Sequence, residues 1–253
     1  MFEIINGNCL DVLEDFAREG RRFDAVIADP PYCSGGVTPA SVKSGVRKYI
    51  NRTDLGDFGD GMTQRAYVLF SRYWLESCRK LLKSPGYIFL FIDWRQLPTL
   101  SDALQISGFI WRGVAVWDKI HARPNKGQIT QSSEFILWGT KDGEKSEKIV
   151  HAGVIREHAP TAEARIHPTQ KSPRVISELL QILPDEASAV LDPFAGSGAT
   201  GIAALERGLD FVGIEASAKY CELARGRLES TEQLKRTTGQ TVDQHRKTAF
   251  LWS

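Results

Sequence analysis

The stretch A-V-L-D-P-F-A-G-S-G-A-T-G, Ala189 to Gly201, decides the fold, because a short apolar strand runs into a glycine-rich turn that opens a helix. Gly196, Gly198 and Gly201 match the pattern G-x-G-x-x-G. Glu215 follows Gly196 by 19 residues, at the end of the next expected strand. In a βαβ unit of this kind the glycines let a ligand approach the backbone, and the carboxylate accepts from ribose hydroxyls. The stretch therefore predicts a parallel sheet with a nucleotide-like ligand at this turn.

Asp192 indicates which ligand the turn suits. It closes the first strand of the unit, where its carboxylate would repel the two phosphates of a dinucleotide and would pair with an ammonium group. S-adenosylmethionine carries an ammonium group, a ribose and an adenine but no phosphate. The pattern D-P-F-x-G-x-G therefore favours that cofactor over NAD, and a purely structural glycine turn is the third interpretation.

A second stretch, A-D-P-P-Y, ends another apolar run at Tyr32. The strand expected over Phe23 to Ala28 is short and partly β-branched, as in a buried parallel strand. Pro30 and Pro31 stop it and donate no backbone hydrogen bond, so the turn offers only acceptors, among them the Asp29 carboxylate. Tyr32 places a flat ring beside them. Such a pocket suits a planar group with an N–H donor, such as a nucleobase amine; the alternative is a strand-ending turn with a packed tyrosine.

Strand-like and helix-like segments alternate along the chain, which is typical of an α/β fold with a mostly parallel sheet. We expect Phe109–Trp117 and Glu134–Trp138 to pair antiparallel at a sheet edge, and Ser84-Pro85-Gly86 to end the longest helix. Apolar runs predict strands over Glu3–Asn6, Phe23–Ala28, Tyr87–Ile92, Phe109–Trp117, Glu134–Trp138, Ala189–Leu191 and Phe211–Ile214. Helical spacing and capping residues predict helices over Leu10–Arg18, Met62–Leu82, Leu100–Ile106, Pro173–Ile182, Thr200–Arg207 and Lys219–Leu228.

Two stretches do not follow the alternation. Cys33–Gly61 is rich in glycine and serine, and a loop of this length inside a domain is usually functional or disordered. Because it follows the D-P-P-Y turn directly, we expect it to close over a substrate. Lys141–Ile166 is polar and lacks a clear period. Between Arg112 and Arg174, Lys and Arg outnumber Asp and Glu by 11 to 7, which suits phosphate contacts and equally suits an ordinary solvated face.

The composition fits one domain over residues 1–253. The chain is 42% hydrophobic and 25% charged with a formal net charge of +1, which neither requires nor excludes a nucleic-acid partner. No apolar run of about 18 residues predicts a membrane span. The 4 cysteines lie far apart without a C-x-x-C pair, which predicts reduced thiols, no metal site and a cytoplasmic protein.

Three motifs in this order resemble those of the amino-methylating DNA methyltransferases of the β subgroup, which modify exocyclic nitrogens of adenine or cytosine. They are D-P-P-Y at Asp29–Tyr32, H-P-T-Q-K at His167–Lys171 and D-P-F-A-G-S-G at Asp192–Gly198. The resemblance implies a circularly permuted Rossmann-like, S-adenosylmethionine-dependent methyltransferase fold, with a mostly parallel seven-stranded sheet and helices on both faces. It places Ala189–Leu191 beside Phe23–Ala28, and it implies insertions at residues 33–61 (a substrate loop) and 123–166 (a small target-recognition region).

The resemblance also implies the site residues. The catalytic turn comprises Asp29, Pro30, Pro31 and Tyr32, with the Asp29 carboxylate and the Pro30 carbonyl accepting from the target amine and Tyr32 stacking on the base. G-N-C replaces the family's usual G-D-C, so the neutral amide of Asn8 stands where an aspartate contacts the cofactor adenine. The cofactor-binding residues implied are Asn8 and Cys9 for adenine, Glu215 for ribose, Asp192, Phe194, Gly196 and Gly198 for the methionine part, Thr169 and Lys171 near the cofactor carboxylate, and Asp29.

The activity implied is transfer of a methyl group from S-adenosylmethionine to the N6 amine of an adenine flipped out of double-stranded DNA. The D-P-P-Y turn favours adenine over the cytosine N4 amine, whose enzymes often have serine at the position of Asp29. Weaker alternatives are an RNA or protein-glutamine methyltransferase, which tends to have N-P-P-Y, an NAD-dependent oxidoreductase and a non-catalytic DNA-binding module. The sequence leaves open whether the chain forms a homodimer.

Overall fold

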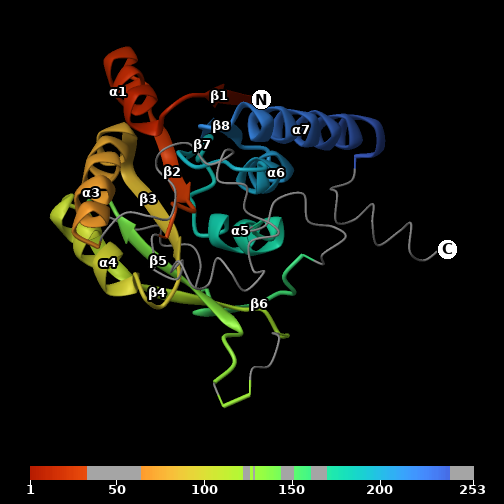
Figure 1. Cartoon of the computed structure of the whole chain (residues 1–253). Helices are drawn as coiled ribbons and strands as arrows, with labels where there is room; N and C mark the ends of the chain where they lie inside the picture. The colour runs from red at the N-terminus through yellow and green to blue at the C-terminus, as the bar shows by residue number, and fades with distance from the viewer. Residues whose placement is uncertain (33–63, 122–125, 128, 144–150, 161–169, 240–253) are drawn as a thin grey trace.

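The computed structural model describes residues 1–32, 64–121, 126–127, 129–143, 151–160 and 170–239, and arranges their strands in one eight-stranded sheet between helices (Figure 1). The strands are β1 (Phe2–Asn6), β2 (Phe23–Ala28), β3 (Leu82–Ile92), β4 (Ile110–Asp118), β5 (Ser133–Thr140), β6 (Val154–Arg156), β7 (Ala189–Asp192) and β8 (Asp210–Glu215). The helices are α1 (Cys9–Glu19), α3 (Gln64–Leu81), α4 (Leu97–Ile106), α5 (Pro173–Leu180), α6 (Ala199–Glu206) and α7 (Ala218–Thr238).

The strand order is β1-β8-β7-β2-β3-β5-β4-β6. The first five strands in this order, from β1 through β8, β7 and β2 to β3, are all parallel. β5 runs antiparallel to both β3 and β4. β7 pairs with β2 through Ala25–Val190 and Val26–Leu191. The predicted neighbours are therefore confirmed, and so are the Rossmann-like fold and its permuted order, in which the glycine-loop strand comes near the end of the chain.

Both faces of the sheet are covered, which explains why β2 reads as one continuous apolar run. Ala25 and Ile27 point to the face covered by α5, α6 and α7. Val26 and Ala28 point to the opposite face, which α1, α3 and α4 cover (Figure 1). Alternate residues of one strand thus belong to two separate cores, as the period of two in a strand requires.

A buried carboxylate joins β2 to β7 at the amino ends of the strands, opposite to the D-P-P-Y turn. Asp24 accepts from the backbone N–H groups of Ser188 at 2.8 Å and Ala189 at 2.9 Å, and it pairs with Lys83 at 2.9 Å. Burial acts against ionisation, but these donors hold the pKa of Asp24 below its ordinary value. Asp24 therefore fixes the register of two strands that lie far apart in the sequence.

The expected end of the longest helix needs a correction. Ser84-Pro85-Gly86 does not form a loop after α3, because α3 ends at Leu81 and β3 begins at the next residue. Leu82 pairs with Phe23, and Tyr87 pairs with Ala25, so the residues between Leu82 and Tyr87 bulge out of the ladder. The proline and glycine interrupt the strand register without ending the strand.

The predicted count of seven strands is also wrong, because β6 adds an eighth. β4 and β5 pair antiparallel as expected, but β6 pairs in parallel with β4 and takes the edge position. β6 spans only Val154–Arg156, and three residues show no periodicity that a sequence could reveal. The predicted substrate loop, residues 33–61, lies outside the described residues, as do large parts of 123–166. Within the described ranges, no helix combines the length and apolarity needed to cross a membrane.

Replacing either of two glycines by alanine should change the stability of the protein, in opposite directions for the two positions. A Cβ on Gly201 would lie 2.6 Å from Phe211 and 2.7 Å from Leu228, because α6 packs closely on β8 and α7. A Cβ on Gly226, inside α7, would meet nothing within 4 Å. We expect Gly201→Ala to lower the free energy of unfolding by about 1–3 kcal/mol. We expect Gly226→Ala to raise it by about 0.5–1 kcal/mol, since alanine favours the helix. Urea denaturation of both variants checks this; a change of the same sign in both contradicts the packing described here.

Candidate active site

Four carboxylates from different parts of the chain meet near the carboxyl edge of the parallel strands. Asp29 follows β2, Asp192 ends β7 and Glu215 ends β8. Glu134 joins them from the amino end of β5, because that strand runs in the opposite direction. Ligands of open α/β sheets bind outside this edge, so the predicted site residues lie where the fold places a ligand.

The first part of the site is the glycine turn around Asp192. Its carboxylate is buried and accepts from the Phe194 backbone N–H at 2.9 Å and from the Thr200 hydroxyl at 2.5 Å. Burial raises the pKa of Asp192 to about 7, and the nearby carboxylates of Asp29 and Glu215 act in the same direction. A cationic ligand at this turn would favour the ionised form of Asp192.

Glu215 closes the same turn from the neighbouring strand. Its carboxylate accepts from the backbone N–H groups of Gly196 and Ser217, both at 2.9 Å. Gly196 and Gly198 have φ values of +50° and +81°, in the left-handed region that favours glycine. Because Glu215 already occupies the Gly196 N–H, this donor is not available to a phosphate. The turn is therefore built around the protein's own carboxylates rather than around an anionic ligand.

The remaining predicted cofactor residues lie beside this turn. The Phe194 ring meets Trp74 of α3 edge-on, with 5.1 Å between ring centroids. Asn8 accepts from the Leu10 N–H at 3.1 Å and so caps α1. Cys9 is buried, and burial raises the pKa of its thiol to about 12, which keeps it protonated. The cap explains the short polar residue at Asn8, and its contact with a cofactor adenine stays a prediction.

The second part of the site is the D-P-P-Y turn, where Lys171 is the central group. The buried ammonium of Lys171 lies 2.9 Å from Asp29 Oδ2 and 3.2 Å from Glu134 Oε2, and it donates to the Tyr32 hydroxyl at 3.0 Å. The Tyr32 hydroxyl in turn is hydrogen-bonded to the Asp29 carboxylate. Tyr32 and Asp29 are thus fixed relative to each other through one cation.

Glu134 belongs to a second ion pair as well. Its Oε1 lies 2.6 Å from the ammonium of Lys119, which follows β4. Burial opposes ionisation of Glu134, but Lys171 and Lys119 outweigh it and lower the pKa of this carboxyl. For Asp29 burial is the larger effect, and its pKa is raised although Lys171 acts in the opposite direction. The two carboxylates that share Lys171 therefore differ in basicity, with Asp29 the more basic.

The sequence did not identify all of these residues. It assigned no role to Glu134 or Lys119, because only the antiparallel pairing of β5 brings them to this edge. It placed Lys171 beside a cofactor carboxylate, whereas the structure shows it on Asp29 and Glu134. The cofactor contact of Lys171 stays a prediction, and Thr169 lies outside the described residues.

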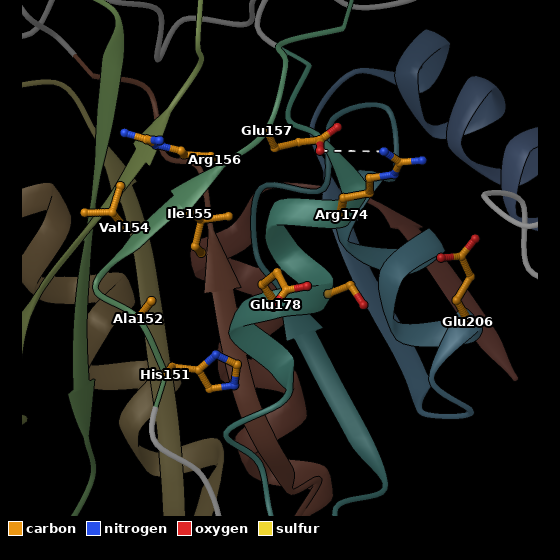
Figure 2. A pocket seen from close by; sticks show the side chains of 10 residues that line it. His151, Ala152, Val154, Ile155, Arg156, Glu157, Arg174, Glu178 and Glu206 are labelled. Atoms are coloured by element: carbon orange, nitrogen blue, oxygen red, sulfur yellow. Dashed lines mark ion pairs between the residues drawn. The ribbon is translucent and has the colours of Figure 1, made fainter. Parts of the chain in front are cut away.

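Residues of β6 and α5, with their neighbours, line a hollow (Figure 2). Its charges have both signs: Arg156 and Arg174 face it together with Glu157 and Glu178, and Arg174 pairs with Glu157 at 3.7 Å. None of the predicted site residues lines it.

Comparison with protein families and curated proteins gives consistent matches. The family described as DNA methylase, N6_N4_Mtase, matches residues 23–226. The Type II methyltransferase M2.MboI of Moraxella bovis is 27% identical over 262 residues, covering 95% of this chain and 93% of the relative. The Type II methyltransferase M2.DpnII of Streptococcus pneumoniae is 28% identical, covering 83% of this chain and 84% of the relative.

Solved structures show the same fold. The M1.HpyAVI–SAM complex superposes with a TM-score of 0.70 at 25% identity, covering 90% of this chain and 99% of that one. The cytosine-N4-specific PvuII DNA methyltransferase gives a TM-score of 0.69 at 16% identity, covering 89% of this chain and 86% of that one. Because the chain shares its fold with a cytosine-N4-specific enzyme, the fold alone does not identify the target base.

Replacing Lys171 by methionine should destabilise the protein in a pH-dependent way. The variant leaves Asp29 and Glu134 buried without their shared cation, and breaking a buried ion pair costs about 3–5 kcal/mol. The folded-state pKa of Asp29, which is already raised, then rises further, and that of Glu134 rises as well, so the loss of stability is greatest at high pH and shrinks as pH falls. Denaturant unfolding at about pH 8 and about pH 5 measures it.

The matched control is Lys80→Met, which removes an exposed lysine of α3. It should leave the pH dependence of unfolding unchanged. A Lys171→Met variant whose loss of stability is the same at both pH values would argue against a buried, ionised triad.

Proposed function

The chain belongs to the N6_N4_Mtase family of DNA methylases, and we propose that it transfers a methyl group from S-adenosylmethionine to the exocyclic N6 amine of adenine in double-stranded DNA. One observation carries this proposal. The Asp29 carboxylate follows β2, and the Asp192 turn follows the directly paired strand β7. An acceptor for an amine and a turn suited to a cationic ligand are therefore neighbours at one edge.

The residues at the glycine turn fit S-adenosylmethionine better than a dinucleotide. Asp192 and Glu215 carry the charge opposite to its ammonium and sulfonium groups, and they would repel a pyrophosphate. Glu215, at the end of β8, can also accept from ribose hydroxyls while it holds the Gly196 N–H. Asp192, Phe194, Gly196 and Glu215 would hold this cofactor. The structurally similar M1.HpyAVI–SAM complex contains it, as its name states. When bound, it supplies an electrophilic methyl group and retains the electron pair of the broken C–S bond.

The D-P-P-Y turn would prepare the amine. The lone pair of an exocyclic amine is delocalised into the base, and N–H hydrogen bonds to the Asp29 carboxylate and the Pro30 carbonyl would localise it on nitrogen. Pro30 and Pro31 hold these acceptors in a fixed turn, so that little reorganisation is needed. After the N–C bond forms, the nitrogen carries a surplus proton, and Asp29 accepts it before releasing it to water. The raised pKa of Asp29 suits this role.

Tyr32 would hold the base. Its hydroxyl is fixed by Lys171 and Asp29, so its ring has a defined orientation. Stacking of a base on such a ring contributes about 1–3 kcal/mol. A base inside a duplex cannot reach an edge of this kind, which requires the target nucleotide to flip out.

Basic residues around the same edge support a DNA partner. Arg95 follows β3, Lys119 follows β4 and Arg156 ends β6. Arg95 and Arg156 are largely exposed, with 48% and 78% of their side-chain surface accessible. Such residues can contact backbone phosphates on either side of a flipped nucleotide. We propose that the protein acts in the cytoplasm.

The target base is proposed from Asp29, and cytosine N4 is the second candidate because the family and the fold include enzymes of that type. Unmethylated DNA incubated with the protein and S-adenosylmethionine, then digested to nucleosides, should contain N6-methyladenine by mass spectrometry. N4-methylcytosine instead would retain the mechanism and overturn the choice of base.

Asp29→Ala should abolish most of this product. Losing an acceptor that acts on the transition state lowers the rate by about a hundredfold to a thousandfold. Asp15→Ala is the matched control, because Asp15 pairs with Arg18 on the exposed face of α1. Normal activity of Asp29→Ala, with the control also active, would remove Asp29 from the mechanism.

Cofactor affinity should depend on Asp192. Because burial raises its pKa to about 7, binding of a cation requires loss of a proton at lower pH. We expect the affinity for S-adenosylmethionine to fall by up to about tenfold per pH unit below that value. Calorimetry at about pH 5.5 and about pH 7 measures it, and Asp192→Asn should bind weakly without this dependence.

NAD should give no thermal stabilisation; stabilisation by NAD alone would favour the oxidoreductase alternative.

A further inference from the structure

We propose that Glu134 is a positioning residue of this site, which shares the Lys171 ammonium with Asp29 and so leaves the Asp29 carboxylate able to accept from the target amine. This inference rests on the proposed function and deepens it. Glu134 lies at the start of β5 and has no role in any sequence motif described above.

The Lys171 ammonium bridges two strands that are not neighbours. Asp29 follows β2 and Glu134 begins β5, and β3 lies between these strands. The ammonium sits 5.5 Å from the ring centroid of Phe91 on β3, and 2.9 Å and 3.2 Å from the two carboxylates. The cation therefore lies beside β3, between two carboxylates from the strands on either side, and the Asp29 contact is the shorter one.

Glu134 is fixed for this role by a second cation. Its Oε2 faces Lys171 and its Oε1 faces Lys119 at 2.6 Å, so each oxygen has its own partner. The four side chains carry two positive and two negative charges, which compensates their burial. Glu134 consequently cannot rotate towards or away from Lys171 without breaking one ion pair.

Sharing the cation matters because of what Asp29 has to do. An ammonium bound to Asp29 alone would neutralise that carboxylate and weaken it as an acceptor. When two carboxylates share the ammonium, it still compensates their buried charge. The Asp29 carboxylate then remains basic and able to accept a hydrogen bond. The same ammonium also anchors the Tyr32 hydroxyl at 3.0 Å. Glu134 thereby influences both groups that would contact the base without touching the base itself.

The decisive experiment is the pH profile of kcat/KM for DNA in Glu134→Gln and Lys171→Met, measured at saturating S-adenosylmethionine so that protonation of Asp192 does not set the acidic limb. Asp29 must be ionised to accept, so activity falls as pH drops through its pKa. Removing the Glu134 charge gives Lys171 entirely to Asp29, and the acidic limb should move to lower pH. Removing the Lys171 charge should move it to higher pH. We expect the plateau activity of Glu134→Gln to fall about tenfold, because Asp29 becomes a weaker base.

A second readout needs neither cofactor nor DNA. The carboxyl carbon of Asp29 can be followed by ¹³C NMR in the free protein, with its signal assigned by its absence in Asp29→Asn. Its titration midpoint should fall in Glu134→Gln and rise in Lys171→Met. Glu76→Gln is the matched control, since Glu76 pairs with Arg72 on α3 and should change neither measurement.

The outcomes are distinguishable. A merely structural role predicts that Glu134→Gln loses stability and activity without moving the acidic limb or the Asp29 titration, and that result overturns the inference. If Glu134→Gln does not fold, Glu134→Asp can replace it, because the shorter side chain keeps the charge but moves it away from Lys171. The titration midpoint of Asp29 should then fall by a smaller amount. If the wild type methylates no base at all, the proposed function fails, whereas the titration of Asp29 still reports on the sharing of Lys171.

Discussion

The pairing of β2 with β7 is the constraint on which the site depends. These strands belong to opposite ends of the chain, and their parallel alignment puts the D-P-P-Y turn and the glycine turn at one edge. Asp24 secures the alignment at the opposite ends of the strands by accepting from the backbone N–H groups of Ser188, which precedes β7, and Ala189, its first residue. A slip of one residue would turn alternate side chains to the wrong core and separate the two turns.

Electrostatics then divides the edge into two parts with different tasks. Around Asp192 and Glu215, backbone N–H groups and a hydroxyl donate to the carboxylates but carry no positive charge. A cationic ligand would therefore be favoured there. Around Asp29 the charge is compensated by Lys171, a residue of the protein itself. The first part suits a ligand that arrives with positive charge, and the second suits a neutral amine that needs an acceptor. This division follows from burial, because carboxylates in water would not differ in this way.

The sequence predicted most of the fold because its signals were local. The strand Phe23–Ala28 was predicted with its observed bounds, since prolines mark its end and apolar residues fill it. The glycine turn was predicted because left-handed φ values at Gly196 and Gly198 need that residue type. β6 was not predicted, and the break at Ser84-Pro85-Gly86 was misread, because both depend on pairing with a strand distant in sequence.

The sequence by itself determined the order of elements, the two turns, and the residue types Asp29, Tyr32 and Asp192 at the strand ends. Only the tertiary structure decided where Lys171 points and that Glu134 and Lys119 join it. The physical reason is range. Chain stiffness and hydrophobic period act over a few residues and can be read along the sequence. A buried ammonium is positioned by whichever carboxylates the sheet brings within ion-pair distance, and that depends on the direction and order of strands.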